Sequence, residues 1–116
     1  MSKATALFLC ITLFLLVQII TWFQLNGQFF SSWFKNNVLI LCLMGIPIIW
    51  LYIEATKMGF IAFEGLIWPG RLLGFAAGML TFAVCANVFM GEGLTTETVV
   101  SLVLATVLTL IQVFWR

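Results

Sequence analysis

Glu64, Trp68 and Arg71 are the residues of this chain whose types and spacing could do chemistry. An acid, an indole and a guanidinium fall within one short, otherwise apolar stretch. An ionisable group costs roughly 2.5–3.5 kcal/mol at mid-depth in a bilayer, so it marks either a function or a tightly paired contact. Glu64 could bind a cation or a proton, and Trp68 could stack on a substrate. Arg71 could either pair with Glu64 or hold an anionic headgroup.

The composition assigns the chain to the integral membrane proteins. Of its 116 residues, 64% are hydrophobic and 8% are charged, against about 25% charged in an ordinary soluble domain. A chain of this length cannot enclose so much apolar surface in a soluble core. The net charge of +1 gives no basic patch for a nucleic acid.

Enzymatic and metal chemistry have little support in the sequence. The chain has no His, and Cys10, Cys42 and Cys85 are dispersed through apolar runs, where a Cys behaves as a small hydrophobe. A catalytic site needs a cluster of titratable groups or metal ligands. We therefore predict no enzyme activity, no metal and no cofactor.

The apolar runs predict one all-α domain over residues 1–116, with four transmembrane helices at about 4–23, 37–53, 70–90 and 96–115. Each run approaches the 20 residues that a span needs. The run from 59 to 90 is too long for one straight span, and Pro69-Gly70 supplies a break. We expect 59–68 to be a half-helix or an interfacial segment, and the third helix to be broken near Pro69-Gly70.

The basic residues predict how the spans are oriented. An even number of spans places Lys3, Lys57, Arg71 and Arg116 on one side and Lys35 on the other. Basic residues near helix ends favour the cytoplasm. We expect both termini to be cytoplasmic, in a cell or inner membrane.

Small residues at four-residue spacing predict close helix packing. Gly70, Gly74 and Gly78 form one such stripe, and Ser101, Ala105 and Thr109 form a second. Small side chains let membrane helices approach closely. Two interpretations remain open: both stripes pack helices within the subunit, or one of them, preferably on the last helix, forms a homodimer.

The second half of the chain resembles the four-helix drug/metabolite transporter superfamily, which includes the small multidrug resistance exporters. The residues that carry the resemblance are Gly59–Phe63, Ile67–Gly70 and Phe89–Thr95. An uncharacterised four-helix branch of that superfamily is more similar still, through Phe82–Val84, Arg71 and the pair Trp22-Phe23. The resemblance implies a dimerising subunit with a pathway lined by helices 1 to 3, in which Trp68 faces the substrate.

The chain departs from the exporters in its first helix. The exporters place an essential Glu there, whereas Gln18 is the most polar side chain of this helix. Because Gln does not titrate, the exporters' proton exchange cannot be carried over. The charge bias also favours one fixed orientation, which argues against an antiparallel homodimer.

Two functions follow from these patterns. The first is a transporter-like, dimeric subunit for a small solute or lipid, with Gln18, Glu64, Trp68, Arg71 and Asn87 along its pathway or gate. The second is a non-transporting scaffold or accessory subunit that binds partner membrane subunits through its small-residue faces. A simpler role for Glu64 and Arg71 also remains open, in which they form a salt bridge that pins the half-helix.

Overall fold

The computed structural model describes residues 2–115, which form helices and turns without a strand. The elements are α1 (Lys3–Asn26), η1 (Gly27–Phe29), α2 (Ser32–Asn36), α3 (Val38–Leu43), α4 (Gly45–Ala62), α5 (Trp68–Met90) and α6 (Thr96–Phe114). Four helical segments of the described chain are long and apolar enough to cross a membrane: Lys3–Phe29, Val38–Ala62, Trp68–Met90 and Thr96–Phe114. The prediction of an all-α, four-helix membrane protein is confirmed.

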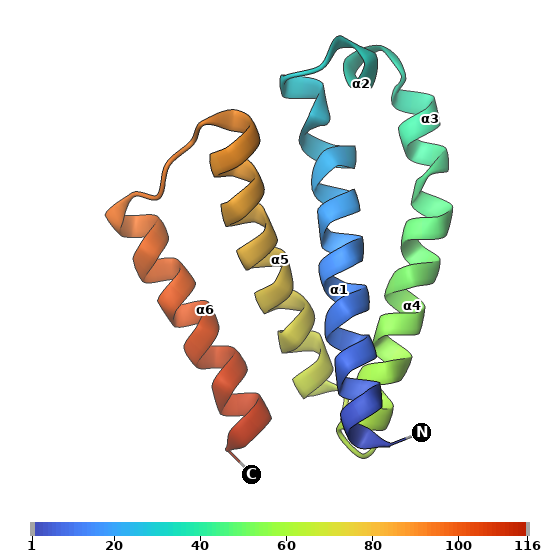
Figure 1. Cartoon of the computed structure of the whole chain (residues 1–116), viewed down its shortest axis with the longest axis vertical. Helices are drawn as coiled ribbons and strands as arrows, with labels where there is room; N and C mark the ends of the chain where they lie inside the picture. Colours follow the sequence, from blue (N-terminus) through green and yellow to red (C-terminus); the bar gives the residue numbers. More distant parts are fainter. Residues whose placement is uncertain (1, 116) are drawn as a thin grey trace.

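The helices form a flattened row in the order α4, α1, α5, α6 (Figure 1). The molecule measures 46 × 36 × 17 Å along its principal axes. α1 packs against both α4 and α5, while α6 packs along α5 at the outer edge. α1 begins and α6 ends at the same end of the molecule, and α2 lies at the opposite end (Figure 1).

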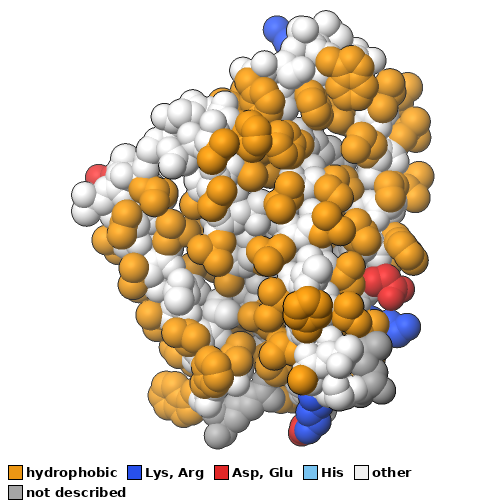
Figure 2. Space-filling view, viewed as in Figure 1, with side chains coloured by type: hydrophobic (Ala, Val, Ile, Leu, Met, Phe, Trp, Pro, Cys, Tyr) orange, Lys and Arg blue, Asp and Glu red, His pale blue; other side chains and the backbone are white. Residues whose placement is uncertain are grey.

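Apolar side chains cover the visible broad face, with the charged ones at its margins (Figure 2). Large side chains such as Phe8, Leu39 and Phe114 are 68%, 74% and 77% exposed. A soluble monomer rarely presents so continuous an apolar surface, whereas lipid chains solvate it at no cost. The exposed surface therefore fits a chain that crosses the bilayer several times.

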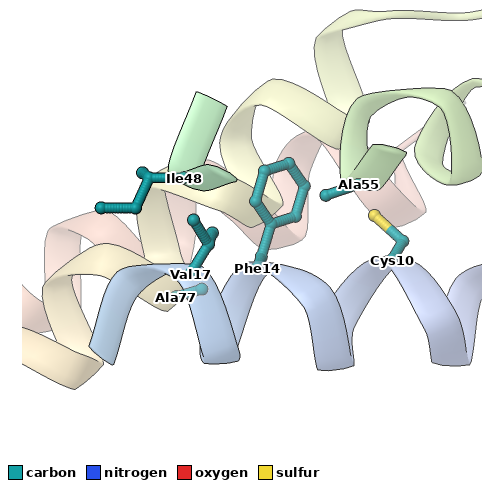
Figure 3. Packing of buried hydrophobic residues seen from close by; sticks show 6 residues of the cluster. All are labelled: Cys10, Phe14, Val17, Ile48, Ala55 and Ala77. Atoms are coloured by element: carbon teal, nitrogen blue, oxygen red, sulfur yellow. The ribbon is translucent and has the colours of Figure 1, made fainter. Parts of the chain in front are cut away.

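The central core lies where α1 meets α4 and α5. Its buried members are Cys10, Phe14, Val17, Ile48, Ala55 and Ala77 (Figure 3). Close to this core, a Cβ added to Gly59 of α4 would lie 3.4 Å from the Cα of Gly70 of α5. The two glycines thus let α4 and α5 touch beside α1, as small residues do at membrane helix interfaces.

A second cluster closes the end of the molecule near α2. Trp22 is 4% exposed and packs edge-on against Phe23, with ring centroids 5.2 Å apart. Phe30 and Phe89 lie 6.0 and 5.9 Å from the Trp22 ring. The aromatic pair noted late in the first helix is therefore part of a four-ring contact between α1, α5 and the connection that follows η1.

The second span is longer than the sequence suggested. It continues to Ala62 as α4 instead of ending near residue 53. The stretch from 54 to 62 contains no proline, and its glycine, Gly59, packs against Gly70 of α5. The interruption of this span lies earlier, between Leu43 and Gly45. Pro47 has no N–H to donate to the carbonyl four residues before it, and the Gln24 amide donates to the Leu41 carbonyl at 2.7 Å beside this joint.

The expected half-helix at 59–68 is absent from the described chain. Residues 59–62 complete α4, and a turn over residues 63–67 leads into α5. Glu64 and Gly65 have φ of 57° and 91°, so the chain reverses in the left-handed region before reaching Pro69. Pro69 then lies in the first turn of α5, where its missing N–H has no helical partner to lose. The proline begins the third span and does not interrupt it.

Gly91 ends α5 and offers a test of the helix boundary. Its φ is 68°, and its N–H donates to the Ala86 carbonyl. A side chain in the left-handed region costs roughly 1–2 kcal/mol, so Gly91→Ala should lower the free energy of unfolding by about 1 kcal/mol. The measurement is reversible unfolding by SDS in mixed micelles, followed by circular dichroism.

Gly93→Ala is the matched control for this prediction. Gly93 lies in the same loop, and a Cβ there also meets nothing within 4 Å, but Gly93 has no left-handed φ. Equal effects of the two substitutions would contradict the assigned cap.

Candidate functional site

A groove of about 920 Å³ lies between α1, α4 and α5. α1 contributes Phe14 and Gln18, and α4 contributes residues from Ile49 to Phe60. Ile67, just before α5, and the start and middle of α5 up to Phe82 contribute the remainder. Ligand pockets typically occupy about 300–1,000 Å³ and combine apolar walls with a few polar groups. We call this space the α1–α4–α5 groove.

Gln18 lies where the groove reaches the middle of the helices. Its Nε2 donates to the Gly74 carbonyl at 3.3 Å. A Cβ added to Gly78 would lie 3.1 Å from the Gln18 side-chain amide. The glycines at 74 and 78 therefore leave room for Gln18 beside α5, and this side chain is half-buried within the helix layer.

Trp68 and Arg71 lie at the other end of the groove, in the first turn of α5. Trp68 is 65% exposed, and Arg71 is also exposed. Both line the groove together with Ile67. Among the described residues that line it, Arg71 alone carries a charge. The structure thus brings Gln18, Trp68 and Arg71 to one groove.

Glu64 and Asn87 do not line this groove. Glu64 forms an ion pair with Lys3, and both side chains are exposed. Asn87 is exposed on α5 beyond the groove. The suggested Glu64–Arg71 salt bridge is wrong, because the left-handed turn directs Glu64 to the start of α1. Exposed ion pairs contribute about 0–1 kcal/mol to stability, so this pair stabilises the contact between α1 and the turn only slightly.

Most members of the two small-residue stripes pack within the subunit. Gly70, Gly74 and Gly78 meet Gly59 of α4 and the side chains of α1. On α6, Ala105 is 4% exposed, and Thr109 Oγ1 donates to the Leu72 carbonyl of α5 at 3.3 Å. Ser101 is exposed. The interpretation of internal packing therefore accounts for the buried members of both stripes, and Ala105 and Thr109 are not free to join a second subunit.

Several groove residues were not anticipated from the sequence. Tyr52, Thr56 and Phe60 lie at intervals of four along α4 and line the groove. Their spacing marks one helix face, which is a detectable signal. It was missed because the second span was expected to end at residue 53. No group of His, Cys, Asp or Glu in the described chain is arranged to hold a metal.

No protein-family model matches the chain, and neither a curated protein nor a solved structure shows significant similarity to it. The resemblance to four-helix transporters consequently stays a prediction that rests on the short motifs of the second half of the chain.

Proposed function

We propose that this membrane protein is a transporter-like subunit that binds a small solute or lipid in the α1–α4–α5 groove. The observation that carries the proposal is the groove itself, about 920 Å³ in volume, with Gln18 along it and Trp68 and Arg71 at its end. Ionisable and polar groups inside a membrane protein commonly mark a substrate pathway. With no acid among its lining residues, the groove suits binding by Arg71 and stacking on Trp68 better than proton exchange.

The proposed working form is a homodimer with both termini in the cytoplasm. Trp68 and Phe82 are 65% and 52% exposed, so the groove has one open side, which the dimer must leave accessible to a ligand. The grouping of Lys3, Lys57 and Arg71 towards the end where α1 begins supports the orientation. The interface would use an exposed apolar face outside the groove. It would not use Ala105 and Thr109, which already contact α5.

A non-transporting accessory subunit is the second candidate. The feature that favours it is α6, whose apolar side chains Val103, Leu104 and Leu108 are 56%, 59% and 50% exposed along one flank. A partner membrane subunit could pack there, although lipid serves equally well.

Flux through proteoliposomes tests the transporter proposal. Three fluorescent probes cover the substrate classes: a head-labelled phosphatidylglycerol, a head-labelled phosphatidylcholine and entrapped carboxyfluorescein. We expect at least one probe to cross faster than in empty liposomes. Arg71→Gln should slow an anionic probe by about tenfold, because a hydrogen bond to a charged group is worth about 1.5–3 kcal/mol. Gln18→Leu should slow the same probe.

Glu64→Gln is the matched control, since Glu64 lies close to Arg71 in sequence but pairs with Lys3 outside the groove. Its flux should equal that of the unsubstituted protein. If no probe moves, the accessory role is favoured instead. Flux that is unchanged when Gln18 and Arg71 are replaced would remove these two residues from the pathway.

A further inference from the structure

The Arg71 side chain makes no ion pair or hydrogen bond with another side chain of the described residues. Within residues 2–115 it makes no ion pair, and the ion pair of this region joins Glu64 to Lys3 instead. None of the four acidic residues, all of which belong to the described chain, lines the groove. A guanidinium at an apolar surface is matched by a carboxylate or a phosphate, with which it forms paired hydrogen bonds. The end of the groove is therefore suited to an anion.

The length of the groove matches one leaflet of a bilayer. From Arg71 to Phe82 the lining of α5 spans 11 residues, which is roughly 16 Å at the rise of an α-helix. Half of the hydrocarbon core is about 15 Å. Arg71 lies in the first turn of a candidate span, so a ligand held there by its charge would extend from the interface to the middle of the membrane.

The walls of the groove are apolar and open sideways. Trp68, Phe75 and Phe82 line it in succession along α5 and are 65%, 43% and 52% exposed. Because α5 is a membrane span, this open side faces the bilayer and not water. A free small anion would find apolar walls there, whereas an acyl chain can enter laterally from the leaflet.

The geometry points to one anionic lipid of the adjoining leaflet as the ligand of this groove, with its headgroup at Arg71 and its acyl chain along α5 towards Phe82. This assignment rests on the proposed function, because it names the substrate class of the same groove. The head is recognised by charge and the chain by aromatic contact, so the site should distinguish an anionic lipid from a zwitterionic one of the same chain length.

Fluorescence quenching at Trp68 tests the assignment. The reporter variant keeps Trp68 and carries Phe at Trp22, Trp33, Trp50 and Trp115. It is reconstituted in phosphatidylcholine vesicles that contain a minor fraction of lipid brominated in its acyl chains, either phosphatidylglycerol or phosphatidylcholine. Brominated phosphatidylglycerol should quench Trp68 with a relative binding constant roughly fivefold higher than that of brominated phosphatidylcholine. This is the gain in affinity for an anionic lipid that one basic side chain near the membrane surface is expected to give.

Substitutions of Arg71 sharpen the result. Arg71→Gln should abolish the preference and Arg71→Glu should reverse it, while Arg71→Lys should retain part of it. Lys57→Gln is the matched control, because Lys57 is an exposed basic residue of α4 that does not line the groove. Its preference should be unchanged. Circular dichroism and gel filtration confirm that each variant folds, and Arg71 is exposed enough to tolerate replacement.

Three outcomes would overturn the assignment. Equal quenching by both brominated lipids removes the charge recognition. Displacement of phosphatidylglycerol by inorganic phosphate, but not by chloride at equal ionic strength, identifies a site for a free anion. Trp68 shielded from every brominated lipid, together with a cross-linked dimer, shows that a second copy fills the groove.

The lipid assignment and the transport proposal can fail separately. Transport of carboxyfluorescein with no lipid preference would contradict the lipid assignment alone, whereas lipid preference without any flux would contradict the transport proposal alone.

Discussion

Replacing Gly74 with Leu should destabilise the protein by about 3 kcal/mol, which is at the upper end of the usual cost of overpacking. Gly74 is buried on α5, and a Cβ added there would lie 3.0 and 3.1 Å from Cε1 and Cζ of Phe14. Phe14 is itself 5% exposed in the core between α1 and α4. The leucine must therefore displace either this ring or α5. The measurement is the free energy of unfolding in an SDS titration.

A second substitution at Phe14 separates the steric clash from other effects of the introduced leucine. Phe14→Ala removes the ring that the leucine meets, so the double variant should lose at least about 1 kcal/mol less than the sum of the two single losses. Gly93→Leu is the control for adding the side chain itself, because Gly93 lies in open space. Strict additivity of Gly74→Leu and Phe14→Ala would contradict the contact between α1 and α5.

Truncating Trp22 to Ala should cost about 3 kcal/mol, as expected for removing a large buried aromatic side chain. The indole is 4% exposed and holds Phe23, Phe30 and Phe89 together near the α2 end of the molecule. Its loss leaves a cavity between α1 and α5 that their backbones cannot close. Thermal unfolding of the purified protein in detergent should show a lower midpoint.

Trp22→Phe should cost less than about 1 kcal/mol. The Trp22 Nε1 is buried without a hydrogen-bond partner among the described residues, and removing an unsatisfied donor offsets part of the lost packing. Trp50→Ala is the control, since Trp50 is 61% exposed on α4 and does not line the groove. A loss at Trp22→Phe as large as at Trp22→Ala would show that the indole N–H has a role that this packing does not explain.

The number and type of the spans could be predicted from the sequence because each span is a continuous apolar run flanked by polar or turn residues. The ends of the spans could not be predicted as well from the sequence. The residues around Pro69 look the same in the sequence whether the proline breaks a helix or begins one. In the structure, the left-handed turn at Glu64 ends the preceding helix, so Pro69 begins the next one. A non-Gly residue with positive φ gives no sequence signal, since the conformation is imposed by the helices on either side.

Part of the candidate site was also readable. Gln18, Trp68 and Arg71 stand out as polar or amphipathic side chains in apolar runs, and the structure places all three around one groove. The ion pair between Glu64 and Lys3 could not be predicted from the sequence. Lys3 begins α1 and Glu64 follows α4, so the two residues approach each other only after these helices have packed together. Long-range proximity of this kind depends on topology, which a single sequence leaves open.

The position of α6 at the edge of the row has a consequence for synthesis. The residues that line the groove run from Phe14 to Phe82, and α6 begins at Thr96. A ribosome adds roughly 5–20 residues per second from the N-terminus, so α1, α4 and α5 leave it before α6 does. The groove can therefore assemble in the membrane while the last helix is still being made. α6 then packs against the outer side of α5 through Ala105 and Thr109.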